Sequence, residues 1–584
     1  MSWSRVLNRP TPHDDHPARR VSQRQGLPPL NRKMASASPL VPALALLLAA
    51  AFVAPPPALA VQPDARSMGS VGATTLDRVT IDDGSFRKGG KEFHFIGFNQ
   101  YYMLDKARRP SERHIVDETL KDAAELGMTV MRTWAFDDRP TGLQVLPGVF
   151  DEDTFRALDY VLDSSARHGI HVILALVNYW PDYGGMESYV KWCTHSTTVA
   201  NRSVSEFYEN PACRQMYKNT VQTVMTRRNT YNGRVYNEDP TILGWDLANE
   251  PRNPGDPSSN VLARWIREMS HFAKLVSPRQ LITTGVEGFF GLTTPNLALN
   301  ANPGRDEWDS WICEGTDFVR FHSLPHVDFT VAHMYPDLWV DRPCNGSYYC
   351  KELFASRWVD THIEQSVMLG KPFVLEEFGS TANTSSAGTR SYARDMKHRE
   401  DVFETVFTEM EEAASRSEIS VGSLFWSFSS LKYPDYDGFS VYAPPRESKT
   451  SEEPQTVDGG AGGREFDWGI ASWSTAVGGN PVLFSPAPRE DPLDYIWVMP
   501  DTPEMQNEFR NARKHRQCAR YLRKSVRDGL ITSSFREKPQ AGDSLGSNLV
   551  PFREVETSHD DTINIISNAA RKFDRLSQRE AFEG

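Results

Sequence analysis

The sequence predicts an α/β protein built as a (β/α)₈ TIM barrel, with a large insertion between the eighth strand and the last helix. Short, nearly continuous apolar segments alternate with amphipathic segments of helical period from residue 93 to residue 428. This alternation is typical of a parallel sheet that helices cover on both faces. Eight apolar segments occur, and the 584 residues exceed the roughly 250 to 400 that one barrel of this type uses.

The expected elements follow one another in a regular order. Apolar runs of strand length predict the eight strands at residues 94–99, 129–134, 171–177, 242–247, 281–286, 327–333, 373–377 and 421–428. Apolar residues at helical spacing predict intervening helices at 115–126, 155–162 and 261–272. Gly127 and Gly169 follow the first two of these helices, so we expect those helices to end there.

The barrel pattern is interrupted at residues 446–550, which combine loop-forming composition with Trp468, Trp473 and Trp497 and a basic amphipathic helix at 506–527. Helical period returns at 560–576, and an eight-unit barrel needs a helix after its eighth strand. We therefore expect the barrel strands within 61–445, an insertion at 446–550, and the last barrel helix with the C-terminus at 551–584. Two alternatives stay open for the insertion: it covers or extends the cleft at the open end of the barrel, or it has no role in ligand binding.

The first 60 residues have the pattern of a secretory signal. A polar segment at 1–33 precedes an unbroken apolar run at 43–54, and the small-x-small sequence Ala58-Leu59-Ala60 follows. The apolar run is shorter than the roughly 20 residues needed to span a bilayer. We expect cleavage after Ala60, a secreted, extracellular protein and no stable membrane insertion. Two alternatives stay open, a true start at Met34 and an uncleaved anchor, because 33 residues make an unusually long segment before the apolar run.

The net charge and the cysteine spacing indicate which partners, cofactors and disulfides to expect. The formal net charge of −12 and the pI near 5.7 argue against nucleic acid as the main partner. No Cys-x-x-Cys or paired-His spacing occurs, and we expect neither a metal nor a cofactor. Six cysteines in a secreted chain allow fifteen connectivities. Short separations favour two local bridges and leave two cysteines over: Cys193 with Cys213, Cys344 with Cys350, then Cys313 and Cys518. Three glycosylation sequons fall in expected loops, at Asn201, Asn345 and Asn383.

Two of the expected strands end in carboxylates that a Pro or Gly soon follows. One reaches Asn249-Glu250-Pro251 and the other Glu376-Glu377-Phe378-Gly379. In a barrel of parallel strands, such ends point into the mouth of the site. Glycosidic bond cleavage needs two carboxyl groups there, one to protonate the leaving oxygen and one to attack or to activate water. A single Glu at a strand end is more often a solvated salt-bridge partner; the pair, 127 residues apart with barrel units between, indicates a catalytic site.

The other strand ends carry residues that a merely solvated rim would lack. They are Asn99, Arg132 with Trp134, Asn178, Glu287, His333 with Tyr335, and Trp426. A solvated rim would show Ser, Asp, Lys and Gly instead. Trp134 taken alone indicates a core residue, and a lone His is more often structural. The convergence of the whole set on one rim is what predicts a binding site.

With these residues the chain resembles glycoside hydrolase family 5 and, within it, the endo-β-1,4-mannanases of the plant type. The likeness runs from about Phe86 to Phe439 and resumes at the last helix. The segments that carry it are 95–102, 130–136, 183–192, 285–291, 315–318, 331–339 and 424–426. Asn-Glu-Pro and Glu-Phe-Gly are features of the wider family. Gly-x-Glu-Gly-Phe-x-Gly and His-x-Tyr-Pro-Asp-x-Trp resemble the mannanases more narrowly.

The resemblance implies a role for each candidate residue. Glu250 corresponds to the acid/base and Glu377 to the nucleophile, and the remaining site positions match Arg132, Asn249, His333, Tyr335 and Trp426. Arg132 and Tyr335 can hold Glu377 ionised. Asn249 can bind a sugar 2-hydroxyl, and His333 can orient Glu250 or a sugar hydroxyl.

Three further positions complete the expected site. Trp426 offers a face on which a pyranose ring stacks. Arg252 resembles a contact on the leaving-group side, with a surface ion pair as the alternative. Two-residue alternation along a strand places Glu376 on the side opposite Glu377.

As a whole, the resemblance implies a secreted, retaining, monomeric endo-hydrolase. Its substrate partner would be β-1,4-linked mannan, glucomannan or galactomannan. Two alternatives remain: another family 5 glycosidase, such as a β-1,4-glucanase or exo-β-mannosidase, and a non-catalytic carbohydrate-binding barrel.

Overall fold

A computed structural model describes eight stretches of the chain. They are residues 76–195, 204–303, 311–341, 343–382, 389–416, 418–429, 435–443 and 559–578. The expected signal at 1–60 and the expected insertion at 446–550 lie outside them, together with Cys518 and the sequons at Asn201 and Asn383.

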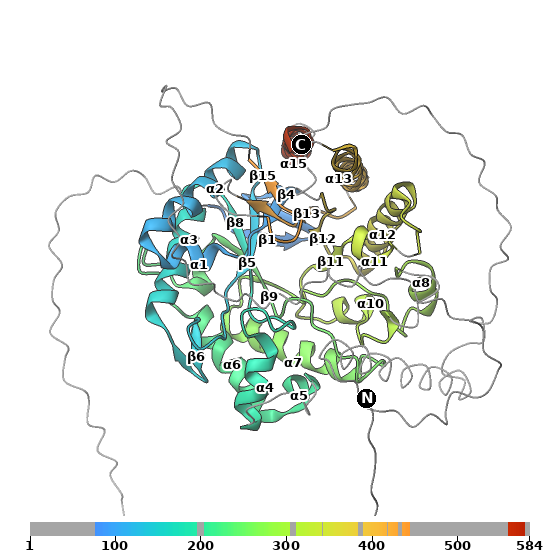
Figure 1. Cartoon of the computed structure of the whole chain (residues 1–584). Helices are drawn as coiled ribbons and strands as arrows, with labels where there is room; N and C mark the ends of the chain where they lie inside the picture. The colour runs from blue at the N-terminus through green and yellow to red at the C-terminus, as the bar shows by residue number, and fades with distance from the viewer. Residues whose placement is uncertain are drawn as a thin grey trace, which may run out of the picture. The chain divides into compact units, whose positions relative to one another are not determined.

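An eight-stranded parallel sheet forms the centre of the described chain (Figure 1). Its strands are β4 (Phe95–Asn99), β5 (Val130–Trp134), β8 (His171–Ala175), β9 (Ile242–Asp246), β10 (Leu281–Thr283), β11 (Thr330–Met334), β12 (Phe373–Phe378) and β13 (Val421–Phe425). The pairing order is β10-β9-β8-β5-β4-β13-β12-β11, so the eighth strand pairs with the first and the sheet nearly closes into a barrel. Every residue of these strands is buried, as their continuous apolar composition predicts. The predicted barrel is confirmed.

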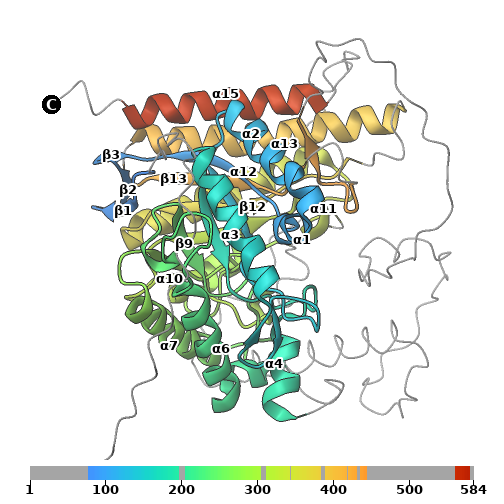
Figure 2. The same ribbon diagram turned by 90° about the vertical axis from the view of Figure 1, so that its left-hand side faces the viewer.

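Helices surround the barrel strands (Figures 1 and 2). The longer ones are α2 (Arg113–Glu125), α3 (Glu152–Arg167), α4 (Gly185–Thr194), α6 (Pro211–Met225), α7 (Asn260–Val276), α12 (Tyr348–Leu369) and α13 (Arg390–Arg416). Shorter ones are α1 (Met103–Arg108), α5 (Ser205–Glu209), α8 (Pro295–Asn300), α10 (Phe318–His322) and α11 (Pro336–Trp339), with 3₁₀ turns at Pro110–Glu112 and Tyr236–Glu238. α3 begins where the Asp151 side chain accepts from Thr154 N at 2.7 Å, and Gly169, at φ +77°, follows its end.

Small β elements lie beside the barrel. β1 (Val79–Asp82), β2 (Ser85–Lys88) and β3 (Lys91–Glu92) form an antiparallel sheet just before the first barrel strand. Two pairs of short strands complete the set: β6 (Gln144–Leu146) with β7 (Val149–Phe150), and β14 (Phe428–Ser429) with β15 (Val441–Tyr442).

The last helix, α15 (His559–Gln578), packs on α13 and on the first barrel strand, β4. Figure 2 shows α15 running alongside α13. Its buried face consists of Ile563, Ile566, Ala569, Ala570 and Phe573. Two polar contacts fix its position: Ser577 Oγ accepts from His94 N at 3.0 Å, and Lys572 pairs with Glu411 at 2.8 Å. A helix is present at the residues for which helical period predicted one, 560–576.

Two disulfides confirm the expected local bridges. Cys193 at the end of α4 is bonded to Cys213 in α6, and Cys344 is bonded to Cys350 at the start of α12. Asn345, the sequon within the second loop, is exposed. Among the described residues, no helix is both long and apolar enough to cross a membrane.

Asp337, in α11, joins three segments that follow barrel strands. Its carboxylate accepts from Lys351 Nζ at 2.9 Å, from Ser380 Oγ at 2.7 Å and from Thr381 N at 2.9 Å, and it lies 3.2 Å from His398 Nε2. Burial raises the pKa of this carboxyl, but the contacts with His398 and Lys351 outweigh it and hold the pKa well below its usual range.

The variant Asp337→Asn is expected to lower the free energy of unfolding by about 3 kcal/mol near neutral pH, because it leaves buried cations without their anion. Because the pKa is lower in the folded state, the carboxylate stabilises the fold above its unfolded pKa of about 3.9. That stabilisation is lost as the pH falls towards the folded pKa. Urea unfolding at pH 7 and pH 3 should show the gap between variant and wild type shrinking in acid. Asp341→Asn, which removes an exposed partner of Lys351, is the control, with a change of about 0.5 kcal/mol or less. An equal gap at both pH values would contradict this assignment.

Candidate active site

The two glutamates singled out from the sequence face each other at the mouth of the barrel, with His333 between them. Glu250 follows β9 and Glu377 lies in β12. His333 Nδ1, from β11, is 2.8 Å from Glu250 Oε1 and 3.5 Å from Glu377 Oε2. One oxygen of each glutamate and the imidazole nitrogen all lie within 4.8 Å of one another. The two carboxyl groups are therefore close enough to act on the same bond of a bound ligand.

Backbone contacts on both sides fix the direction of Glu250. Its N–H donates to Gly285 O at 2.7 Å, and the N–H of Asn249 donates to Val177 O at 2.7 Å. Glu250 has φ +48°, a left-handed conformation that is unfavourable for a residue with a Cβ. The neighbouring strands hold this turn in place, and it aims the carboxylate into the site.

Arg132, in β5, organises the base of the site. It is fully buried, and each guanidinium nitrogen donates to a different part of the site. Nε donates to Asp246 Oδ2 at 2.7 Å, Nη1 to Glu377 Oε1 at 2.5 Å, and Nη2 to Asn249 Oδ1 at 2.8 Å. Nη1 also reaches Asn99 Oδ1 at 3.2 Å. One side chain thus sets the positions of groups at the ends of β4, β9 and β12.

Each catalytic candidate has a second donor. Tyr335 OH donates to Glu377 Oε2 at 2.6 Å, so both oxygens of that carboxylate are bonded. Trp180 Nε1 donates to Glu250 Oε2 at 2.5 Å. Asn249 Nδ2 donates to Asn178 Oδ1 at 3.0 Å, which fixes the orientation of its amide. The contacts expected of Arg132 and Tyr335 with Glu377 are present.

The electrostatics of the cluster differ between its members. Burial raises the pKa of Glu250, but the contact with His333, the charge of Arg252 and the Trp180 hydrogen bond outweigh it and lower that pKa to about 2. Burial would lower the pKa of His333, but the carboxylates of Glu377, Glu250 and Glu376 raise it to about 10. For Glu377, burial prevails over the charges of His333 and Arg132, and its pKa is raised. These opposite shifts favour a charged imidazole next to an ionised Glu250.

A metal ion does not suit this cluster, although its three donor atoms are close together. Arg132 already donates to Glu377, so one of the two carboxylates is engaged by a cation, and His333 Nδ1 lies at hydrogen-bond distance from Glu250. The two carboxyl groups and the imidazole are instead suited to exchanging a proton with one another.

Aromatic side chains form one wall of the site. Trp426, after β13, is partly buried and lies parallel to Tyr101, with ring centroids 5.5 Å apart and an interplanar angle of 9°. Its Nε1 donates to Asp437 Oδ2 at 3.0 Å, which fixes the ring, and the Trp426–Ser427 peptide is cis. Trp134 lies 6.1 Å from Trp426 between ring centroids and is only 5% exposed. Trp426 can therefore present an apolar face to a ligand, and Trp134 mainly supports it.

Arg252 forms an ion pair, but a buried one. It donates through Nε to Glu287 Oε2 at 2.6 Å and through Nη2 to Glu287 Oε1, and its side chain is 11% exposed. Its guanidinium also lies 5.1 Å from the ring of Trp180, which donates to Glu250. Of the expected alternative, the ion pair is present, but it is largely buried and does not lie on the surface.

The expected position of Glu376 is also wrong. Its Oε2 lies 3.7 Å from Arg132 Nε and 3.6 Å from His333 Nε2, on the same side of the strand as the site. The cause is an irregular register in β12. Leu375 pairs with Ala332 and Glu377 with His333, so Glu376 has no partner on β11. Such a bulge cancels the alternation of side chains, and two consecutive glutamates face the barrel interior.

Sequence reasoning missed two residues of the site. Trp180 lies in the loop after β8, two residues beyond the strand-end Asn178, so a search of strand ends stopped just short of it. Asp246 lies within the apolar run of β9, and its charge was the available signal.

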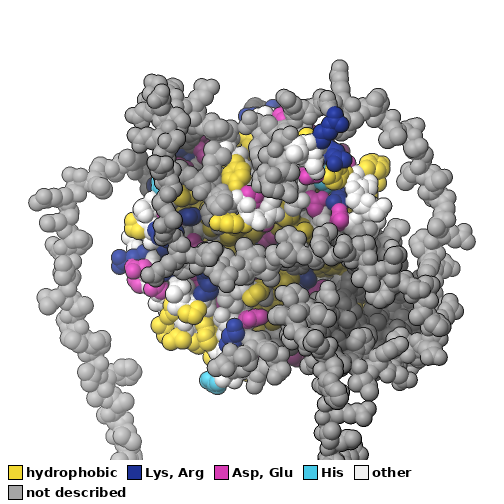
Figure 3. Space-filling model, viewed as in Figure 1, with side chains coloured by type: hydrophobic (Ala, Val, Ile, Leu, Met, Phe, Trp, Pro, Cys, Tyr) yellow, Lys and Arg dark blue, Asp and Glu magenta, His cyan; other side chains and the backbone are white. Residues whose placement is uncertain are grey.

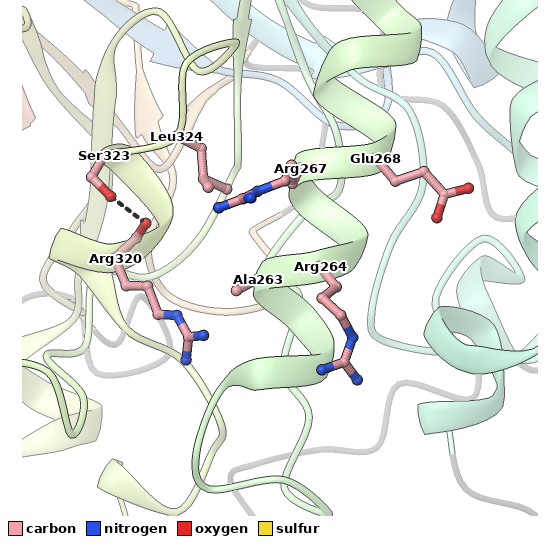
Figure 4. Close-up of a pocket in the computed structure, with 7 residues that line it drawn as sticks. All are labelled: Ala263, Arg264, Arg267, Glu268, Arg320, Ser323 and Leu324. Carbon is pink, nitrogen blue, oxygen red and sulfur yellow. Dashed lines mark hydrogen bonds between the residues drawn. The ribbon is translucent and has the colours of Figure 1, made fainter.

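Outside the barrel mouth, the described residues line a groove between α7 and α10 (Figure 4). Arg264, Arg267 and Arg320 border it, with Glu268 as its only carboxylate. Glu268 is paired with Lys218 and Arg214, so this groove has no pair of free carboxyl groups for glycosidic chemistry. Figure 3 shows acidic and basic side chains interspersed on the face in view, without separation by sign.

The chain is similar to known proteins over the barrel. The family model for "GH family 5 beta-mannosidase-like" proteins matches residues 76–439. The putative mannan endo-1,4-beta-mannosidase 5 of Oryza sativa subsp. japonica is 37% identical over 361 residues, which are 61% of this chain and 71% of that protein. The putative mannan endo-1,4-beta-mannosidase 4 of Arabidopsis thaliana is 35% identical over 398 residues, 68% of this chain and 92% of that protein.

The chain is also similar to a solved structure of a mannanase. The hyperthermostable endo-1,4-beta-D-mannanase from Thermotoga petrophila RKU-1 is 30% identical, with a TM-score of 0.52. The similarity covers 61% of this chain and 96% of that one.

Proposed function

The chain belongs to the glycoside hydrolase family 5 β-mannosidase-like family, and on this premise we propose that it is a retaining endo-β-1,4-mannanase. Its substrates would be mannan, glucomannan or galactomannan, which are the polysaccharides that the sequence resemblance implies. The two plant relatives carry the name mannan endo-1,4-beta-mannosidase, and the Thermotoga protein is titled an endo-mannanase. No metal or cofactor takes part in the proposed reaction.

The observation that carries the proposal is the placement of Glu250 and Glu377 around His333, within 4.8 Å. Glu377 attacks the anomeric carbon while Glu250 protonates the leaving oxygen. Glu250 then takes a proton from water, which hydrolyses the glycosyl–enzyme intermediate. Arg132 and Tyr335 orient the attacking carboxylate through its two oxygens. Asn249 is placed to bind the 2-hydroxyl, where contacts strengthen in the transition state, and Trp426 offers a stacking face.

The remaining parts of the proposal concern secretion, oligomeric state and domain organisation. We propose that residues 1–60 contain a secretory signal, that the enzyme acts outside the cell as a monomer, and that 446–550 is an insertion between β13 and α15. Cell fractionation and N-terminal sequencing of the mature protein test the first point. A mature protein that retains residues 1–60 would refute it.

An activity panel tests the activity itself. Purified protein should depolymerise mannan into short oligosaccharides, with little release of sugar from cellulose and slow turnover of mannobiose. Faster hydrolysis of cellulose would identify a β-1,4-glucanase, and release of mannose alone from chain ends would identify an exo-β-mannosidase. Binding without turnover on every substrate would leave a non-catalytic barrel.

The stereochemistry of the product is a further prediction. Retaining enzymes hold their carboxyl groups about 5 to 5.5 Å apart, whereas inverting enzymes need about 6.5 to 9.5 Å to admit a water. The close approach of Glu250 and Glu377 supports retention. Proton NMR during the first minutes of hydrolysis should show the β-anomer of the new reducing end before mutarotation. Early appearance of the α-anomer would exclude Glu377 as a nucleophile.

A further inference from the structure

Beneath the two catalytic glutamates lie two carboxyl groups that the proposed reaction does not use. They are Asp246 in β9 and Glu376 in β12, and both side chains are fully buried. Both carboxyl groups lie near the same guanidinium nitrogen, since Arg132 Nε is 2.7 Å from Asp246 Oδ2 and 3.7 Å from Glu376 Oε2. Two neighbouring carboxylates repel each other in a buried site, and burial together with the charge of Glu376 raises the pKa of Asp246, so we infer that this pair carries one proton.

The surrounding atoms indicate which member carries the proton. Asp246 Oδ2 accepts from Arg132 Nε at 2.7 Å, which leaves Oδ1 to carry a proton. Asp246 Oδ1 and both oxygens of Glu376 have no hydrogen-bond partner among the described residues. Asp246 Oδ1 as the donor and Glu376 as the acceptor satisfy these groups together, with Glu376 bearing the negative charge. Burial and the charge of Glu376 raise the pKa of Asp246, and the charge of Arg132 lowers that of Glu376 against its burial.

Glu376 then faces His333 from the side opposite the reaction. His333 Nε2 lies 3.6 Å from Glu376 Oε2, while Nδ1 faces Glu250 at 2.8 Å and Glu377 at 3.5 Å. His333 Nε2 has no hydrogen-bond partner among the described residues, and the contact with Glu376 is one of charge.

The other charged groups around His333 come from neighbouring strands and their loops. Arg132 from β5 holds both Glu376 and Glu377, and the Glu287–Arg252 pair lies beyond Glu250. Tyr335, a further titratable group among the described residues, donates to Glu377. An imidazole with carboxylates at both nitrogens is stabilised as the doubly protonated cation.

We propose that Glu376 is a positioning residue that acts through His333: as the anion at Nε2, it keeps the imidazole doubly protonated and so stores the proton that Glu250 delivers. This inference rests on the proposed function. When the leaving oxygen is in place, the proton moves from His333 Nδ1 to Glu250 and from Glu250 to that oxygen as the glycosidic bond breaks. When water attacks the glycosyl–enzyme intermediate, Glu250 takes its proton and returns it to His333. No proton is gained or lost beyond the water consumed.

The bulge at Glu376 brings the Glu376 carboxylate to His333 Nε2. With regular alternation, residue 376 would point away from the site, and Nε2 would lack this carboxylate. The irregular register instead brings a second carboxylate to the back of the imidazole.

The pH dependence of kcat/KM on a manno-oligosaccharide tests the proposal with two isosteric variants. Glu376→Gln removes the anion at Nε2 and should move the alkaline limb of the profile to lower pH by about one unit or more, a tenfold or larger change in proton affinity. Asp246→Asn mimics the neutral acid: its oxygen accepts from Arg132 and its amide donates to Glu376. Its alkaline limb should stay within about 0.3 units of wild type, whatever the change in rate. An unshifted limb in E376Q, or an equal shift in both variants, would overturn the proposal.

A second measurement needs neither variant to be active. Nitrogen-15 NMR of the wild-type protein, with the His333 signals identified by their absence in His333→Gln, should show both ring nitrogens protonated at pH 8. A neutral imidazole at that pH would refute the stored proton even if E376Q does not fold. Failure of the proposed function has a different signature, since the wild-type protein would then cleave no mannan while the NMR result could still be positive.

Discussion

Replacing Glu377 with alanine is expected to abolish turnover of every glycoside substrate, because no glycosyl–enzyme intermediate forms without that carboxylate. Arg132 and Tyr335 both donate to Glu377, and its loss leaves the Arg132 charge without its anion at the reaction centre. Steady-state assays should show loss on mannan and on aryl mannobiosides alike, by at least about 10⁴-fold.

Glu250→Ala should behave differently, because its carboxyl group moves protons and does not bond to the sugar. On mannan the loss should be about 10²- to 10⁴-fold, the contribution of a positioned general acid. A dinitrophenyl mannobioside has a leaving group that needs no proton, so its first step should proceed and the second should become slow. Azide, which attacks without a general base, should restore turnover and yield the mannosyl azide. Equal losses in both variants without azide rescue would mean that the two roles are wrongly assigned.

The second large effect is expected from Arg132→Lys, which keeps the charge but loses the planar fork. A lysine ammonium cannot donate at once to Asp246, Glu377 and Asn249, which the guanidinium does with its three nitrogens. Breaking contacts of a buried ion in this way costs about 3 to 5 kcal/mol, so chemical unfolding should show a large loss of stability. The value of kcat should fall as well, because the orientation of Glu377 changes.

A matched variant separates the loss of stability from the loss of kcat. Arg399, in α13, is also fully buried, but it donates to the carbonyl oxygens of Ser380, Gly438 and Ser440 and to no carboxylate of the site. Arg399→Lys should therefore lower the unfolding temperature while leaving kcat within about twofold of wild type. If Arg132→Lys lost stability but kept full kcat, Arg132 would be a structural residue and not part of the proposed machinery.

The barrel and most of the site could be predicted because both depend on local patterns. Buried parallel strands appear as apolar runs, and their C-terminal ends share one rim, so Glu250, Glu377 and His333 could be placed together from sequence order alone. Even the distant last helix could be identified, since an eighth strand without a following helix leaves the barrel incomplete.

The features that could not be predicted depend on register and on loops. The inward direction of Glu376 arises from how β12 pairs with β11 and β13, and no property of residues 373–378 alone reveals a bulge. Trp180 reaches Glu250 from a loop, where spacing along the chain does not give direction. Arg252 illustrates a third case, because exposure is a property of the folded surroundings. Its partner Glu287 was on the same rim, yet the burial of the pair was not readable from either residue.

The last helix has a consequence for the time course of biosynthesis. α15 covers the outer side of β4, the first barrel strand to leave the ribosome, yet 115 residues separate it from the end of the preceding described segment at Ala443. At about 5 to 20 residues per second, synthesis from residue 444 to the end of α15 takes on the order of ten seconds. A barrel that folds during that interval would expose the apolar surface on which Ile566, Ala570 and Phe573 are later buried. A chaperone that recognises exposed apolar surface would have its opportunity then, and a nonsense mutation before residue 559 would make that state permanent.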